Sequence, residues 1–135
     1  MAMQISNWLS EQFLNAVLRG IPYTPPDQIF LALYTSDPTP ANTGTEVAEG
    51  GYERQIIQFG APTLVSGKQK SVTIIDVEFN IATADWGLVT HTGLLDAPTG
   101  GHLLWSKSLG DEARTVLSGD KPKFLAGSSS VAFAQ

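Results

Sequence analysis

From residue 29 onward, the chain is a succession of short apolar or alternating segments separated by turns rich in glycine, proline and aspartate. The run IFLALY, residues 29–34, is too short for a helix and is typical of a buried strand. In SVTIIDVEFNIA, residues 71–82, apolar and polar side chains alternate, which predicts a strand with one solvated face. The positions expected to face the core are Ile75, Val77, Phe79 and Ile81. An opposite parity at Val72 and Ile74 suggests a bulge beside them.

Further strands are predicted in ERQIIQF, WGLVTHTGLLD, GHLLWSKSL, ARTVLS, PKFLAG and SSVAFA, the last covering residues 129–134. Because no helical segments lie between them, parallel pairing is disfavoured. The sequence therefore predicts a mainly β protein, an antiparallel β-sandwich or barrel of about seven or eight short strands.

A single helix is predicted near the N-terminus. Ser6 is a favourable N-cap, apolar residues recur at helical spacing over residues 7–19, and Gly20 follows the last turn. We expect this helix to cover a sheet face or an open end. The whole chain, residues 1–135, is predicted to be one domain, with the helix in residues 5–20, a proline-rich connector at 21–28 and a β-domain at 29–135.

Composition excludes several classes of protein. Eight basic and thirteen acidic residues give a net charge of −5, without the basic stripe of a nucleic-acid-binding protein. The pairs Lys68/Lys70 and Lys121/Lys123 are interpreted as solvated strand ends. There is no cysteine for a disulfide or thiolate site, and no apolar run long enough to span a bilayer. We predict neither nucleic-acid nor membrane partners.

No motif predicts catalysis, a cofactor or a metal. His91 and His102 lack further ligands at metal-binding spacing, and there is no Gly-x-Ser-x-Gly motif. Asp76, Asp85 and Asp96 could assemble a carboxylate pair, but each has an ordinary place on a solvated face or in a turn. The loop at residues 36–46 resembles a calcium loop only faintly, because two prolines interrupt its alternation. We predict a protein that is not an enzyme.

The most distinctive stretch is LALYTSDPTPANTGTEVAEGGYERQIIQF, residues 31–59. It resembles a family of tailed-bacteriophage virion proteins, commonly labelled tail-fibre or minor structural proteins. The later THTGLLDAPTGGHLLWSKSL, residues 90–109, is also similar to that family, as is the spacing of Gly119, Asp120, Phe124, Gly127 and Val131. The resemblance covers nearly the whole chain and implies a structural role in a virion. Its motif residues here are Asp37, Pro38, Glu46, Gly50, Gly51, Tyr52, Arg54 and Gln55.

Physical reasoning interprets this motif as a loop closure. Gly50 and Gly51 can adopt positive φ and turn the chain tightly into a strand. Tyr52 would pack its ring and leave its hydroxyl at an edge. Arg54 could bind an acid, Glu46 or Asp37, through a two-point ion pair. Presentation of the loop to a neighbouring subunit remains the alternative role.

Three functions are considered. Size, a single-domain build and the absence of fibre repeats favour a capsid decoration or cement protein that bridges capsid subunits. The alternative is a tail-associated fibre or baseplate module for host attachment. An enzyme or carbohydrate-binding protein, using Trp86 or Trp105, is the third. The expected partners are the major capsid protein or tail proteins of the same virion, with a homo-oligomer formed through Trp8, Phe13 and Val17. The expected location is the outer surface of the virion, after assembly in the host cytoplasm.

Overall fold

A computed structural model describes residues 3–132 of the chain. The fold is mainly β, with one α-helix near the N-terminus. The described elements are β1 (Gln4–Ile5), α1 (Asn7–Arg19), β2 (Ile29–Tyr34), β3 (Gln55–Ile57), β4 (Thr63–Val65), β5 (Lys68–Val72), β6 (Val77–Glu78), β7 (Gly87–Val89), β8 (His91–Leu95), β9 (Leu103–Ser108), the 3-10 turn η1 (Gly110–Glu112), β10 (Arg114–Val116), β11 (Lys123–Phe124) and β12 (Ser130–Ala132). The predicted fold class is confirmed.

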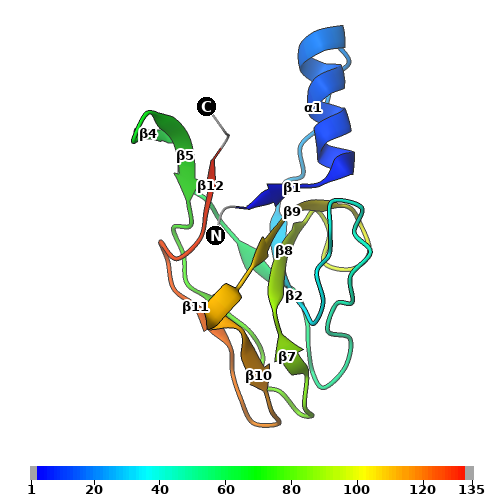
Figure 1. Ribbon diagram of the computed structural model, residues 1–135, viewed down its shortest axis with the longest axis vertical. Helices are drawn as coiled ribbons and strands as arrows, with labels where there is room; N and C mark the ends of the chain where they lie inside the picture. Colours follow the sequence, from blue (N-terminus) through cyan, green and yellow to red (C-terminus); the bar gives the residue numbers. More distant parts are fainter. Residues whose placement is uncertain (1–2, 133–135) are drawn as a thin grey trace.

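Every strand pair in this part of the chain is antiparallel. The central sheet has the order β1-β9-β8-β2-β3, and three smaller sheets join β12-β5-β4, β10-β7 and β11-β6. Figure 1 shows the smaller sheets beside and below the central one. Among residues 3–132, the edge strands β1 and β3 of the central sheet do not pair with each other. The barrel form of the prediction is therefore wrong.

The strands are shorter and more numerous than predicted, because side chains and loops interrupt the ladders. Within residues 71–82, regular pairing stops after Val72 and resumes only at β6. Val77 and Phe79 are buried as expected, but Ile81 is 57% exposed and Ala82 is buried in its place. The parity changes there because Ala82 donates its backbone N–H to the Asp120 carbonyl at 2.8 Å. Of the predicted strand at residues 129–134, positions 133 and 134 lie outside the described residues.

The core lies between the central sheet and the smaller sheets. Leu31, Leu33 and Leu94 from the central sheet share one buried cluster with Val77 and Phe79 from the β6 region. Each of these side chains is at most 2% exposed. Burial of a large apolar side chain stabilises a fold by about 1.5–3 kcal/mol. This buried cluster therefore holds the β11-β6 sheet against the central sheet.

The helix begins and ends where its capping residues predict. The Ser6 hydroxyl oxygen accepts the Leu9 N–H at 3.0 Å, and Gly20 ends the helix in the left-handed conformation with φ of 68°. Leu9 is the one buried residue of α1. Figure 1 shows the helix projecting from the β body, so the expectation that it covers a sheet face holds only for its first turns.

Candidate functional site

The motif residues assemble around a two-point ion pair between Glu46 and Arg54. Arg54 donates from Nε to Glu46 Oε2 and from Nη2 to Oε1, both at 2.8 Å. The Arg54 side chain is 8% exposed and that of Glu46 23%. Of the two acids considered for this pair, the structure uses Glu46. The Glu46 hydrogen bond is the main reason that the pKa of Arg54 is raised, so the guanidinium stays charged.

Arg54 also binds the turn between β8 and β9. Its Nη1 donates to the carbonyl oxygens of Ala97 and Gly100, both at 2.8 Å. These contacts join positions 43 and 46 residues apart in the chain. The sequence offered no signal for them, because a backbone carbonyl has no residue identity. We call Glu46, Tyr52 and Arg54, together with these two carbonyls, the loop clamp.

Tyr52 connects the clamp to the central sheet. Its hydroxyl donates to Glu46 Oε2 at 2.6 Å and accepts the Leu33 N–H at 3.1 Å, on β2 just past its pairing with β3. Its ring stacks on Phe79, at 6.1 Å between centroids, and meets Trp86 edge-on. Burial, and then the Glu46 carboxylate, raise the pKa of Tyr52, so this hydroxyl remains a donor.

Gly50 and Gly51 make the turn that places Tyr52. Their φ angles are 70° and 78°, in the region that favours glycine. The Gly50 carbonyl accepts the Trp86 Nε1–H at 2.9 Å, and a Cβ on Gly50 would lie 2.8 Å from that nitrogen. Trp86 is 7% exposed and belongs to the core, so it offers no surface for sugar stacking. Trp105 is likewise half-buried against the core.

Asp37 and Pro38 organise the loop at residues 36–46. Asp37 Oδ1 accepts the Thr39 N–H at 2.9 Å, and the Pro38 side chain is fully buried. Asn42 Oδ1 accepts the Tyr34 hydroxyl at 3.1 Å, while Glu46 belongs to the loop clamp. Hydrogen bonds within the chain therefore occupy oxygens of all three residues that could have bound calcium. Residues 3–132 contain no group of three His, Cys, Asp or Glu side chains that could hold a metal ion.

The clamp is chemically closed. All three Arg54 nitrogens and both Glu46 oxygens have partners within the chain. An open cleft of about 560 Å³ lies over it, lined by the clamp and by Pro98, Thr99 and Gly100. Within the described part of the chain, no buried side-chain nitrogen or oxygen lacks a hydrogen-bond partner. The arrangement is suited to holding loops together.

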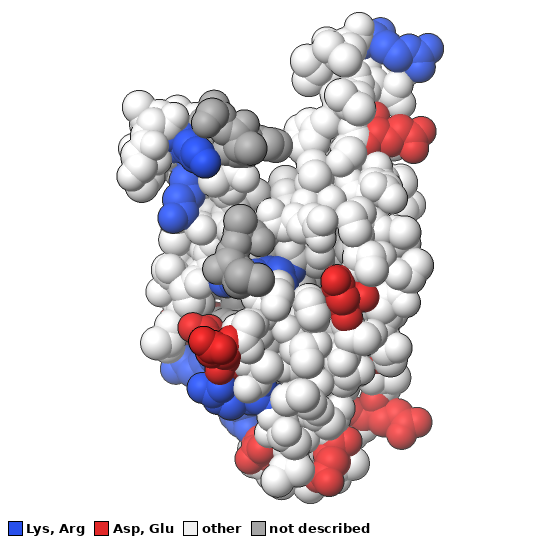
Figure 2. Space-filling model, viewed as in Figure 1, with Lys and Arg blue, Asp and Glu red and all other residues white. Residues whose placement is uncertain are grey.

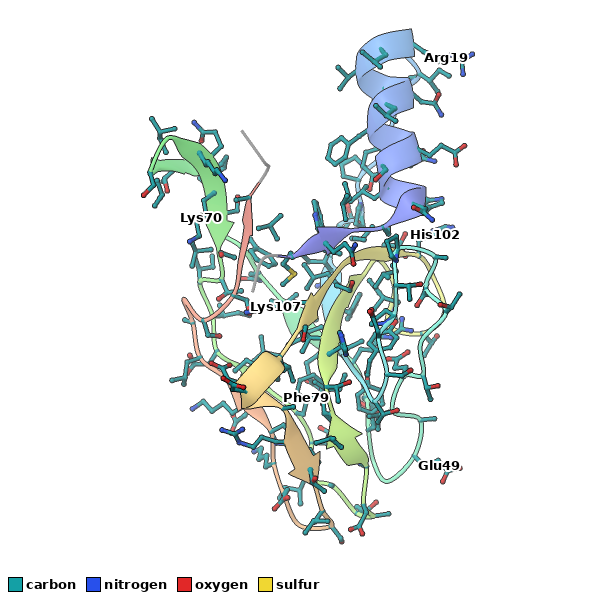
Figure 3. All side chains as sticks on the ribbon, viewed as in Figure 1. Arg19, Glu49, Lys70, Phe79, His102 and Lys107 are labelled. Atoms are coloured by element: carbon teal, nitrogen blue, oxygen red, sulfur yellow. The ribbon has the colours of Figure 1, made fainter. Side chains whose placement is uncertain are left out.

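The three residues expected at a partner contact have different surroundings. Trp8 stacks on His102, with ring centroids 3.9 Å apart and planes 5° apart, at the base of α1 (Figure 3). Phe13 is partly buried against the core. Val17 is 77% exposed. Its exposed apolar neighbours Leu14, Leu18 and Ile21 complete a surface that we call the α1 tip.

Among residues 3–132, no helix has the length and apolar character needed to cross a membrane.

A protein-family model with the description "Podophage GP4 fiber I protein gp80" matches residues 4–132 of the chain. The match takes in α1, the loop clamp and all four sheets. No curated protein matches the sequence.

Proposed function

Because this chain belongs to the family of the podophage GP4 fiber I protein gp80, we propose that it is a non-enzymatic component of a tail fibre, attached to its virion through the α1 tip. Membership itself makes it a structural protein of a tailed bacteriophage and places its partners within the same virion. The attachment surface and the fibre location are the proposal.

The α1 tip is the observation that carries it. Leu14, Val17 and Leu18 are between 60% and 77% exposed, although each is apolar. A contiguous patch of exposed apolar side chains often marks a surface that binds another protein. The tip also projects beyond the β body, where a neighbouring subunit can surround it (Figure 1). An amphipathic helix that inserts into a groove of its partner is a recurring mode of recognition.

The loop clamp supports the same role by stiffening the β8–β9 turn, which also carries His102 beneath α1. A fibre transmits force between the virion and the cell surface, so a long loop such as residues 35–54 needs fixed attachment points. Arg54 supplies two hydrogen bonds to Glu46 within that loop and two to the carbonyls of the β8–β9 turn. Hydrogen bonds to charged groups contribute about 1.5–3 kcal/mol each when both partners are held in place.

The capsid location that size and missing repeats favoured is not our first choice. Neither feature distinguishes a capsid protein from a compact fibre segment, whereas the matching family is described as a fibre protein. Exposure on the outside of the virion and assembly in the host cytoplasm stay parts of the proposal.

Copy number in purified particles tests the location. A fibre component should be one or more orders of magnitude less abundant than the major capsid subunit by quantitative mass spectrometry. A ratio near one would establish the decoration role instead, and absence from particles would overturn both.

Incorporation of variants tests the attachment surface. Leu14→Gln combined with Leu18→Gln should abolish incorporation into particles while the isolated protein keeps its thermal stability. Leu64→Gln, a 67% exposed leucine on β4, is the matched control and should be incorporated normally. Equal incorporation of both variants would show that the α1 tip is not the attachment surface.

A further inference from the structure

A groove distinct from the cleft over the loop clamp is used by none of the functions above. It has a volume of about 660 Å³, within the range of about 300–1,000 Å³ that ligand sites occupy. Its floor is apolar and comes from Leu33, Val89, Val116 and Phe124. We call it the β10–β11 groove, after the two strands that border it.

The groove runs along strand edges. Residues 114, 115 and 116 of β10 all line it, as do residues 120 to 125 around β11. Successive side chains of a strand point to opposite faces, so a surface lined by consecutive residues touches the edge of the strand, where the backbone is accessible. In the described part of the chain, β10 pairs only with β7 and β11 only with β6. Each strand therefore has one edge without a neighbouring strand.

The groove also concentrates positive charge in an acidic protein. Four of the eight basic residues line it, against two carboxylates, whereas the whole chain has a net charge of −5. Figure 2 shows blue side chains gathered at the lower left, over this end of the molecule. The four basic residues are Lys107, Arg114, Lys121 and Lys123, and the two acidic ones are Glu112 and Asp120.

In the part of the chain that the structure describes, two of these four cations have no carboxylate partner. Lys121 and Lys123 pair with Glu78 at 3.2 Å and Asp76 at 3.6 Å. Within residues 3–132, neither Lys107 nor Arg114 forms a salt bridge. Lys107 is half-buried on β9 (Figure 3), whereas Arg114 is exposed and donates to the carbonyl oxygens of Asp111 and Ala113. A half-buried cation beside an apolar floor favours a ligand that brings a negative charge.

We propose that the β10–β11 groove binds an extended acidic segment of a partner protein, which adds as a strand beside β10. Alternate side chains of such a segment would lie on the apolar floor, and the carboxylates between them would reach Lys107 and Arg114. Addition of a strand to a free sheet edge derives its affinity from backbone hydrogen bonds and its specificity from alternate side chains. This proposal stands independently of the fibre assignment and of the α1 tip.

Other anionic ligands fit the groove less well. Nucleic acid needs several phosphate-binding cations, but here two of the four already have partners and two carboxylates share the lining. A saccharide site normally presents an open aromatic ring. Among the described residues that line the groove, the one aromatic is Phe124, which meets Phe79 edge-on at 6.1 Å between ring centroids.

The test is an NMR titration of the full-length protein with a short synthetic peptide of alternating Glu and Val. The expected result is a set of saturable shifts confined to the backbone amides of the groove, with protection from solvent exchange on β10. An oligo-glutamate peptide of equal length should bind more weakly because it has no apolar side chains. An alginate fragment and a single-stranded oligonucleotide represent the acidic saccharide and the nucleic acid. Stronger binding by either of these than by the Glu-Val peptide would overturn the proposal.

Variants locate the binding. Lys107→Gln combined with Arg114→Gln should weaken peptide affinity about tenfold, equivalent to about 1.4 kcal/mol. Arg19→Gln combined with Lys68→Gln removes the same charge from α1 and the β4–β5 hairpin and should leave affinity unchanged. Arg114→Gln alone is the second variant, should the double variant lose its fold in a thermal melt. Absence of peptide shifts, or equal losses in the groove and control variants, would disprove the site.

Discussion

The indole of Trp8 lies flat against the imidazole of His102, with the two planes 5° apart and the ring centroids separated by 3.9 Å. Trp8 lies in the first turn of α1 and His102 just before β9, so this contact sets how the helix leaves the β body. Asp96 holds His102 in turn, accepting its backbone N–H at 2.7 Å and lying 3.1 Å from its Nδ1. The direction of the projecting helix therefore depends on a turn almost a hundred residues away.

Trp8→Ala should loosen α1 without unfolding the β body. Loss of this stack, and of the edge contact with Tyr23, should cost about 2 kcal/mol. Amide hydrogen exchange should accelerate along α1 and stay slow in β2 and β8. Val17→Ala, at a 77% exposed position, is the control and should change stability by less than about 0.5 kcal/mol. Unchanged exchange in α1 of the Trp8 variant would contradict the anchoring role.

Arg54→Leu should be among the most destabilising single substitutions in the chain. It leaves the largely buried Glu46 carboxylate without its partner and removes the two carbonyl contacts. Breaking a buried ion pair by removing one partner costs about 3–5 kcal/mol. Chemical denaturation measures this loss. Arg19→Leu, at an exposed arginine that donates to Asn15 Oδ1 at 3.1 Å, is the control and should be nearly neutral.

Arg54→Lys tests whether geometry matters beyond charge. A lysine keeps the positive charge but cannot make two parallel hydrogen bonds to Glu46 while also reaching Ala97 and Gly100. We expect it to recover less than half of the stability lost in Arg54→Leu, by the same denaturation measurement. Full recovery of that stability would show that the positive charge at position 54 is sufficient and that the geometry of the guanidinium does not matter.

Gly50→Ala should destabilise the fold more than Gly67→Ala. Both glycines have positive φ, 70° and 79°, so both substitutions should incur about 1–2 kcal/mol of backbone strain. At Gly50 the new methyl group would also lie 2.8 Å from Trp86 Nε1, whereas nothing lies within 4 Å of the corresponding position at Gly67. Urea unfolding of the two variants gives the difference directly. Equal losses of stability in the two variants would mean that Trp86 moves away from the new methyl group without destabilising the fold.

Stability should fall as pH rises above 10. Burial, and then the Glu46 carboxylate, raise the pKa of Tyr34 from 10.0 to about 12. The folded state therefore favours the neutral phenol. This contribution is complete below pH 10, the pKa of the unfolded residue, and is lost as pH rises through about 12. Urea midpoints measured across this window should fall less steeply in Tyr34→Phe. An identical slope in the variant would refute the coupling.

Local pattern was sufficient for the parts of this protein whose causes lie within a few residues. The cap at Ser6, the end at Gly20 and the apolar run of β2 all appear where the sequence places them, because capping and strand burial depend on near neighbours. The pairing of Arg54 with an acid of the same loop was also within reach, since a guanidinium beside few acids has few partners.

Prediction went wrong where distant segments decide. Residues 71–82 alternate like one strand, yet Asp76 accepts the Ala126 N–H at 2.8 Å and the ladder breaks there. Farther along, Ala82 donates its backbone N–H to the Asp120 carbonyl and is buried, while Ile81 faces solvent. A periodic pattern records which side chains could share a face, but competition from other backbone groups determines whether the face forms.

The amino-acid sequence alone carries the fold class, the helix with both its ends, the charge that disfavours nucleic acid and the motif that belongs to a virion family. Only the tertiary structure brings the Ala97 and Gly100 carbonyls to Arg54, turns Trp8 onto His102 and lines one groove with half of the basic residues. Those relationships join segments far apart in the chain. They depend on how the sheets pack and not on the identity of any neighbouring residue.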